Sequence, residues 1–147
     1  MRGLIAVWAI LVAAPLVSAC ASTPTSTDSL SVIQTYFHAR NAGDLDGAMA
    51  LVADDAMFIV GPVIYRGSFH TGTAEIRVLH EGEEGRNTRF EVSNLLLDDS
   101  EADRDTIDGS LYVTTDIDEG WAHFEAIVQE GKIVALHRFE GKILERL

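Results

Sequence analysis

The chain has 147 residues, with 11 basic and 23 acidic side chains and a net charge of −12. This length suits one domain, and a hydrophobic share of 47% is enough for a core without disulfide staples. The acidic balance disfavours nucleic acid as a partner, because that binding depends on the neutralisation of phosphates by Lys and Arg. It disfavours flat docking on anionic lipid headgroups for the same reason.

The N-terminal segment has the three-part pattern of a secretory signal peptide. Arg2 precedes an apolar run from Leu4 to Val17, and small residues close the run. The run is shorter than the roughly 20 residues that a membrane-spanning helix needs. We therefore expect residues 1–19 to be a signal peptide and the protein to be exported.

Cys20 is the only cysteine of the chain and follows directly on Leu16-Val17-Ser18-Ala19. This site resembles the lipobox of bacterial lipoproteins, in which the cysteine becomes the acylated first residue of the mature chain. Ala19-Cys20-Ala21 also fits ordinary signal cleavage, which would discard the cysteine and release a soluble protein. A solitary cysteine without a disulfide partner favours the lipoprotein, as does the polar, Pro-containing segment 20–29, which suits a flexible tether.

The resemblance implies a cell-envelope protein that touches the membrane through its lipid anchor only. It implies the periplasmic side, with the outer membrane favoured, where the host has one, because Ala21 rather than Asp follows Cys20.

Residues 30–147 are expected to form the folded domain. Helical spacing of apolar residues predicts helices over Ser29–Asn41 and Asp44–Val52, separated by Gly43, and a third over Thr73–Glu81, with His80 among its less polar members. An extended segment is expected from Ala56 to Val60. The remainder is rich in β-branched and aromatic residues and predicts four strands: Thr88–Leu97, Thr106–Thr115, Trp121–Gln129 and Ile133–Phe139.

This order of elements predicts an α+β fold, with about three helices packed on one face of an antiparallel sheet. Four local motifs also resemble the nuclear-transport-factor-2-like superfamily, a cone-shaped fold that includes SnoaL-like cyclases and ketosteroid isomerases. The motifs are Tyr36-Phe37 with Gly43-Asp44, Leu51-Val52-Ala53-Asp54-Asp55-Ala56-Met57-Phe58, Tyr65-Arg66-Gly67, and Val128-Gln129-Glu130-Gly131-Lys132-Ile133-Val134.

The resemblance suggests two donors for catalysis. Tyr36 matches the oxyanion-hole tyrosine of ketosteroid isomerases, and His123 matches their second acid donor. Val60 stands where those enzymes carry the aspartate base, and a valine cannot abstract a proton. The resemblance implies no cofactor, since this cone supports chemistry by side chains alone, and His38, His70 and His80 lack the spacing of metal ligands.

Two arrangements of the last hairpin remain open. If Glu130-Gly131 is a two-residue turn, His123 pairs with Arg138 and shares a face with Glu125 and Trp121, with Tyr112 nearby. The family comparison places this polar face inside the cone, where Glu125, Arg138, Tyr112 and Trp121 would bind a ligand. Hydrophobic patterning instead places the opposite, apolar face inside, with His137 as the only ionisable side chain that these two strands contribute to the core.

Two functions are carried forward. The first is a lipoprotein of the cell envelope whose cone binds a small, partly apolar molecule, with one sheet face free to form a homodimer. The alternative is a SnoaL-like isomerase, cyclase or hydrolase that uses side-chain acid–base chemistry.

Overall fold

The structure is a computed structural model that describes residues 26–61 and 67–145. The predicted signal peptide, Cys20, most of the tether and the Tyr65-Arg66 motif lie outside these ranges. Within them, no helix is long and apolar enough to cross a membrane.

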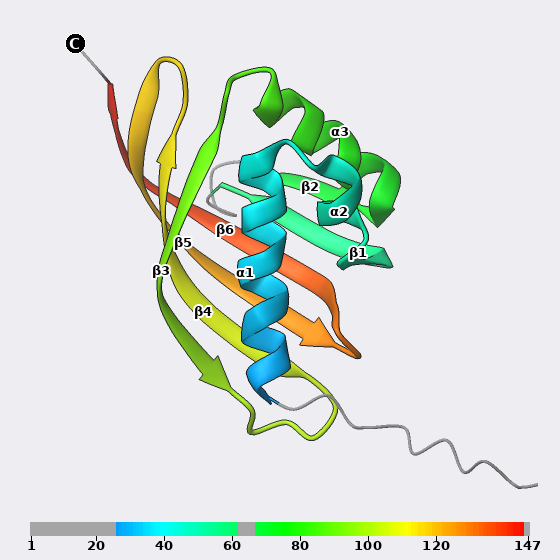
Figure 1. Cartoon of the computed structure of the whole chain (residues 1–147). Helices are drawn as coiled ribbons and strands as arrows, with labels where there is room; N and C mark the ends of the chain where they lie inside the picture. The colour runs from blue at the N-terminus through cyan, green and yellow to red at the C-terminus, as the bar shows by residue number, and fades with distance from the viewer. Residues whose placement is uncertain (1–25, 62–66, 146–147) are drawn as a thin grey trace, which may run out of the picture.

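The fold is α+β, as predicted, with three helices and a single six-stranded sheet. The helices are α1 (Ser26–Ala42), α2 (Leu45–Met49) and α3 (Gly72–Glu84). The strands are β1 (Val52–Val60), β2 (Ser68–Thr71), β3 (Arg89–Asp98), β4 (Asp105–Thr114), β5 (Asp118–Gln129) and β6 (Lys132–Glu145). Figure 1 shows α1 lying across one face of the curved sheet, with α2 and α3 beside it above β1 and β2.

Some predicted bounds shift. Helix α1 begins at Ser26, inside the segment expected to be a tether, and α3 continues to Glu84. Helix α2 ends at Met49, because Val52 already belongs to β1 and pairs with Ile133 of β6. These ends are decided by packing and strand pairing, which local propensity does not report.

The sheet is mixed rather than purely antiparallel. Its order is β2-β1-β6-β5-β4-β3, and β1 runs parallel to β6 while the other neighbours are antiparallel. The first and the last strands of the chain are therefore neighbours at the middle of the sheet. This pairing joins segments far apart in sequence, so no local pattern signals it.

The hairpin between β5 and β6 has the predicted turn but a different register. Glu130 and Gly131 both have positive φ angles, of 51° and 75°, which suits the two-residue turn of a tight hairpin. Val128 lies opposite Ile133, but Ile127 lies opposite Ala135, so Val134 is an extra residue. This β-bulge reverses the faces of β6 relative to β5 beyond that point.

The bulge makes the predicted pair of His123 and Arg138 wrong. Arg138 lies opposite Phe124, and His123 lies opposite Phe139. The inner face of β5 is the apolar one, with Ala122, Phe124, Ala126 and Val128 all buried. The expectation that His137 is the ionisable residue of this core is also wrong, because Arg138 is buried instead and His137 is only partly covered.

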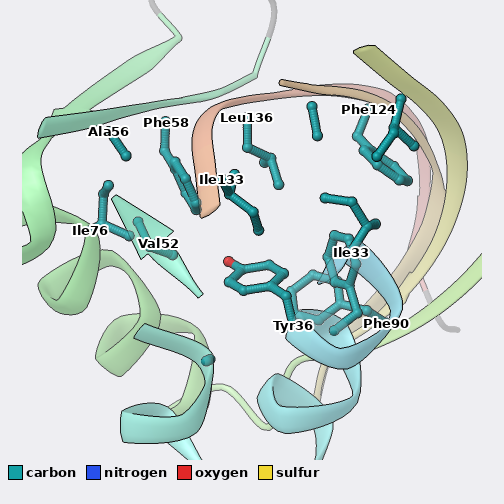
Figure 2. Close-up of a cluster of buried hydrophobic side chains, with 14 of the residues drawn as sticks. Ile33, Tyr36, Val52, Ala56, Phe58, Ile76, Phe90, Phe124, Ile133 and Leu136 are labelled. Atoms are coloured by element: carbon teal, nitrogen blue, oxygen red, sulfur yellow. The ribbon is translucent and has the colours of Figure 1, made fainter. Parts of the chain in front are cut away.

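The hydrophobic core lies between this inner face and the helices. Ile33 and Tyr36 of α1 and Ile76 of α3 are buried against Phe58 of β1 and Phe124 of β5. Figure 2 shows the Tyr36 ring reaching from α1 toward Val52, Phe58 and Ile133, with its hydroxyl inside the cluster. An aromatic network extends this packing, since the Tyr36 ring contacts those of Phe37 and Phe58 edge-on.

Candidate functional site

A buried ion cluster lies where α1, α3 and β6 meet. Glu83 accepts a hydrogen bond from Arg40 Nη2 at its Oε2 atom, at 2.9 Å, and from Arg138 Nη1 at its Oε1 atom, at 2.6 Å. All three residues are buried, with Arg40 and Glu83 each 2% exposed. One carboxylate thus holds two guanidinium groups from different elements, a geometry that gives short, charge-assisted hydrogen bonds.

The helical repeat delivers these side chains to the core. On α3, Ile76, His80 and Glu83 are four and three residues apart, so they share one face of the helix, and all three are buried. On α1, Tyr36 and Arg40 are four residues apart and point the same way. This shared spacing is the sequence signal for the cluster, and it was missed because the predicted α3 ended at Glu81.

His80 connects the ion cluster to Tyr36. The Tyr36 hydroxyl lies 2.8 Å from His80 Nε2, and His80 Nδ1 lies 3.6 Å from Glu83 Oε2. We assign the imidazole proton to Nδ1, facing the carboxylate, so that Nε2 accepts the hydrogen bond that the Tyr36 hydroxyl donates. Tyr36, His80, Glu83 and Arg138 therefore form a continuous polar chain through an otherwise apolar interior.

Burial decides the protonation states of this chain. It raises the pKa of Tyr36, so the hydroxyl stays protonated, and it lowers the pKa of His80, so the ring stays neutral near pH 7. Burial alone would raise the pKa of Glu83, but His80 and the two arginines outweigh it and bring that pKa down to about 2. Glu83 is therefore ionised at neutral pH.

Phe90 of β3 supports both arginines. The guanidinium carbons of Arg40 and Arg138 lie 5.9 Å and 5.6 Å from the centre of its ring. Such cation–π contacts favour a planar guanidinium in a desolvated place. Arg138 is thus fixed by a carboxylate and by an aromatic ring together.

A cavity of about 160 Å³ lies beside the cluster, between the C-terminal end of α3 and the ends of β3, β4 and β5. Glu83 and Arg138 form part of its wall, so the ion cluster reaches the cavity while Tyr36 and His80 are not among its lining residues. The remaining lining residues are Arg86, Thr88, Val113, Thr115, Asp118, Glu119, Gly120, Trp121 and Ala122. The wall therefore combines small apolar surfaces with two cations and several oxygen groups.

Thr88 stands out among the lining residues. Its residue is 6% exposed, and its Oγ1 atom has no hydrogen-bond partner among the described residues. A buried hydroxyl without a partner is costly, and in native proteins such groups commonly meet a water or a ligand. The Thr88 hydroxyl is thus a free donor and acceptor at the cavity wall.

The chemistry open to this site is limited. Glu83 is a weak base, because a carboxylate whose pKa is about 2 has little affinity for a proton. Asp118 is the lining carboxylate that shares the inner face of β5 with Gly120 and Ala122. Among the described residues, no group of three or more His, Cys, Asp or Glu side chains is arranged to hold a metal ion.

The structure separates the predicted site residues. Tyr36 is buried in the core and bonded to His80, and Arg138 lines the cavity. His123 and Glu125 are exposed on the outer face of β5, so the expected convergence of these two residues with Tyr36 and Arg138 inside the cone is wrong. The alternation of side chains along β5 is the reason, since its apolar residues occupy the inner face.

The two predicted aromatic walls lie together at the other side of the strand. Tyr112 and Trp121 are opposite each other on β4 and β5, and their ring centres are 5.1 Å apart. Trp121 also borders the cavity, but 56% of its surface is exposed. These rings therefore do not enclose a pocket for the Tyr36 hydroxyl.

Comparisons with known proteins show the fold and no more. A cystatin-like protein of unknown function from Nostoc punctiforme has a TM-score of 0.64 at 18% identity, covering 78% of this chain and 90% of that one. A protein from Novosphingobium aromaticivorans, provisionally named an aromatic ring hydroxylase, has a TM-score of 0.71 at 15% identity, covering 83% and 93%. A provisional ketosteroid isomerase from Kribbella flavida has a TM-score of 0.61 at 17% identity, covering 82% and 83%.

No family model matches the sequence, and no curated protein matches it. The architecture is the nuclear-transport-factor-2-like cone, which confirms the predicted fold.

Proposed function

Because the chain has the nuclear-transport-factor-2-like cone fold, we propose that it is a binding domain for a small, partly apolar molecule held in the cavity beside Arg138. The observation that carries this proposal is the buried Thr88 hydroxyl, which has no partner among the described residues and faces that cavity. Val113 and Ala122 offer apolar wall nearby. A site that joins apolar surface to a few polar groups is typical of ligand pockets.

The size of the cavity sets the size of the ligand. Its volume of about 160 Å³ is close to the roughly 150 Å³ of engineered cavities that bind benzene. One six-membered ring therefore fits inside, and any larger body must extend through the mouth. We expect weak binding of single-ring molecules, because few atoms can be buried.

Fluorobenzene tests this proposal without any assumption about charge. Its ¹⁹F signal should broaden and shift in saturable fashion when the full chain is added. Val113→Phe, which fills the cavity, should abolish this effect, whereas Val92→Phe, on a partly buried β3 residue outside the cavity lining, should keep it. Equal binding by both variants, or no saturable binding by the wild type, would rule the cavity out as a ligand site.

A second candidate function is the acid–base enzyme that the names of the structural neighbours suggest. The feature that favours it is Asp118, a lining carboxylate that supplies a base where Val60 does not, with Arg138 able to stabilise an enolate oxygen. Cyclohexanone in D₂O would report proton abstraction as exchange of its α-hydrogens, followed by NMR. Exchange that is faster with the wild type than with Asp118→Asn supports catalysis, and equal rates refute it.

The proposed setting of the domain rests on the sequence of the leader. We propose that Cys20 carries the lipid anchor and that the acidic domain stands off the membrane on its tether. Cys20→Ser should abolish incorporation of labelled palmitate in cells and move the protein from the membrane fraction. Continued labelling of that variant would refute the anchor.

A further inference from the structure

Thr88 is placed in the cavity wall by local backbone geometry. It begins the inner face of β3 just after Asn87, whose φ of 51° turns the chain, and its amide donates to the Glu83 carbonyl at 3.1 Å. The backbone of Thr88 is thus satisfied, while its Oγ1 atom is buried without a partner among the described residues. The hydroxyl is a donor held in place on a rigid segment.

Arg138 brings a second donor to the same wall. Its Nη1 atom donates to Glu83 Oε1 at 2.6 Å, and its guanidinium packs on Phe90. Arg40 holds the other oxygen of Glu83 at 2.9 Å, which keeps that carboxylate from turning away. The guanidinium is therefore already ordered, and a ligand that meets it does not have to immobilise a long side chain.

Resting on the proposed function of the cavity, we propose that Thr88 and Arg138 form a subsite for the carboxylate of a small, ring-sized acid. The Thr88 hydroxyl and the Arg138 guanidinium donate hydrogen bonds to the carboxylate, a geometry for which a planar guanidinium is suited. The ring lies against Val113 and Ala122, which border the same cavity.

Two further charged residues of the lining set the direction of binding. Arg86 is exposed at the cavity and attracts an acid, whereas Asp118 repels one. The carboxylate therefore avoids Asp118 and goes to the wall that Thr88 and Arg138 share. An amine would favour the opposite orientation, so the charge of the ligand separates the two cases.

The test compares 4-fluorobenzoate, fluorobenzene and 4-fluorobenzylammonium by ¹⁹F NMR titration of the full chain. We expect 4-fluorobenzoate to bind at least about tenfold more tightly than fluorobenzene, because hydrogen bonds to a charged group are the strong ones. The benzylammonium should bind more weakly than fluorobenzene. Asp118→Asn should tighten 4-fluorobenzoate binding severalfold.

Thr88→Val is the decisive variant, since it keeps the shape of the side chain and removes only a hydroxyl that has no partner among the described residues. It should weaken 4-fluorobenzoate binding about tenfold and leave fluorobenzene binding unchanged. Ser93→Ala is the matched control, because Ser93 Oγ is also buried without a described partner but does not border the cavity. It should change neither affinity.

Arg138→Lys provides a second variant that keeps the charge but loses the planar fork, and it should also weaken the acid selectively. If fluorobenzene binds as tightly as 4-fluorobenzoate, or if Thr88→Val affects neither, the subsite is refuted while the ligand cavity stands. If no probe binds, the cavity proposal fails and the subsite fails with it.

Discussion

Arg138 of β6 lies opposite Phe124 of β5, and this pairing turns its guanidinium into the core. A hairpin of regular register from the Glu130-Gly131 turn would have placed Arg138 beside His123, on the exposed face. The extra residue Val134 makes the difference, because one inserted residue moves every later side chain of a strand to the other face. The contact of Arg138 with Glu83 therefore depends on a single bulge.

Deletion of Val134 tests this dependence. The deletion should turn Arg138 outward and break a buried ion pair, which costs about 3–5 kcal/mol of unfolding free energy in urea denaturation. Val134→Ala keeps the extra residue and should cost about 1 kcal/mol or less. Equal stability of the two variants would show that the bulge is not what orients Arg138.

Glu83→Gln should be among the most destabilising polar substitutions in the domain. It leaves Arg40 and Arg138 buried without the carboxylate that they share, and we expect a loss of about 3–5 kcal/mol in the free energy of unfolding. Glu84→Gln is the control, because the Glu84 side chain is 34% exposed and lies 3.6 Å from Arg40. The neighbouring change should cost less than about 1 kcal/mol, and a similar loss in both would contradict the central role of Glu83.

The pH dependence of stability should follow from two lowered pKa values. The folded pKa of Glu83 is about 2 against an ordinary 4.5, so its contribution is complete above pH 4.5 and is lost as the pH falls toward 2. The pKa of His80 is lowered from 6.5, so below that pH the unfolded chain binds a proton that the folded chain resists. Both effects make stability fall with falling pH.

Variants separate the two windows. The stability difference between wild type and Glu83→Gln should shrink by about 3 kcal/mol between pH 5 and pH 2, measured by urea denaturation. The difference between wild type and His80→Gln should shrink as the pH falls below about 6.5. A difference that stays constant with pH in either variant would refute the corresponding assignment.

Tyr36→Phe should destabilise the core without leaving a large void. It removes the hydroxyl that lies 2.8 Å from His80 Nε2 and leaves that nitrogen buried without its partner, at a cost of about 1–3 kcal/mol. His80→Leu in the same chain should recover part of the loss, since neither polar group then remains. Losses that simply add in the double variant would argue against a coupled pair.

Two glycines provide a matched test of the packing. At Gly109 a Cβ atom would meet the Phe124 ring and the Leu95 side chain, so Gly109→Ala should cost about 1–3 kcal/mol. At Gly82 of α3 nothing lies within 4 Å, so Gly82→Ala should stabilise the protein by about 0.5–1 kcal/mol. Thermal unfolding of both variants checks the opposite signs, and a stabilised Gly109→Ala would show that the inner sheet face is looser than described.

The sequence by itself determined the elements and the class of the fold. The helical spacing in α1, the β-branched runs of β3 to β6 and the Glu130-Gly131 turn are local signals, and local signals survive because backbone propensity and side-chain period act over a few residues. The apolar alternation of β5 likewise indicated its inner face, with Ala122, Phe124 and Ala126 buried.

Only the tertiary structure decided the site. The parallel pairing of β1 with β6, the bulge at Val134 and the meeting of Arg40, Glu83 and Arg138 all join residues far apart in the chain or depend on one-residue differences in register. Such contacts are fixed by the free energy of burying the whole core, in which a buried charge is tolerated only where a partner from another element meets it. For that reason His123 and Glu125 lie outside, while Glu83 and Thr88, which carry no local signature of function, define the cavity.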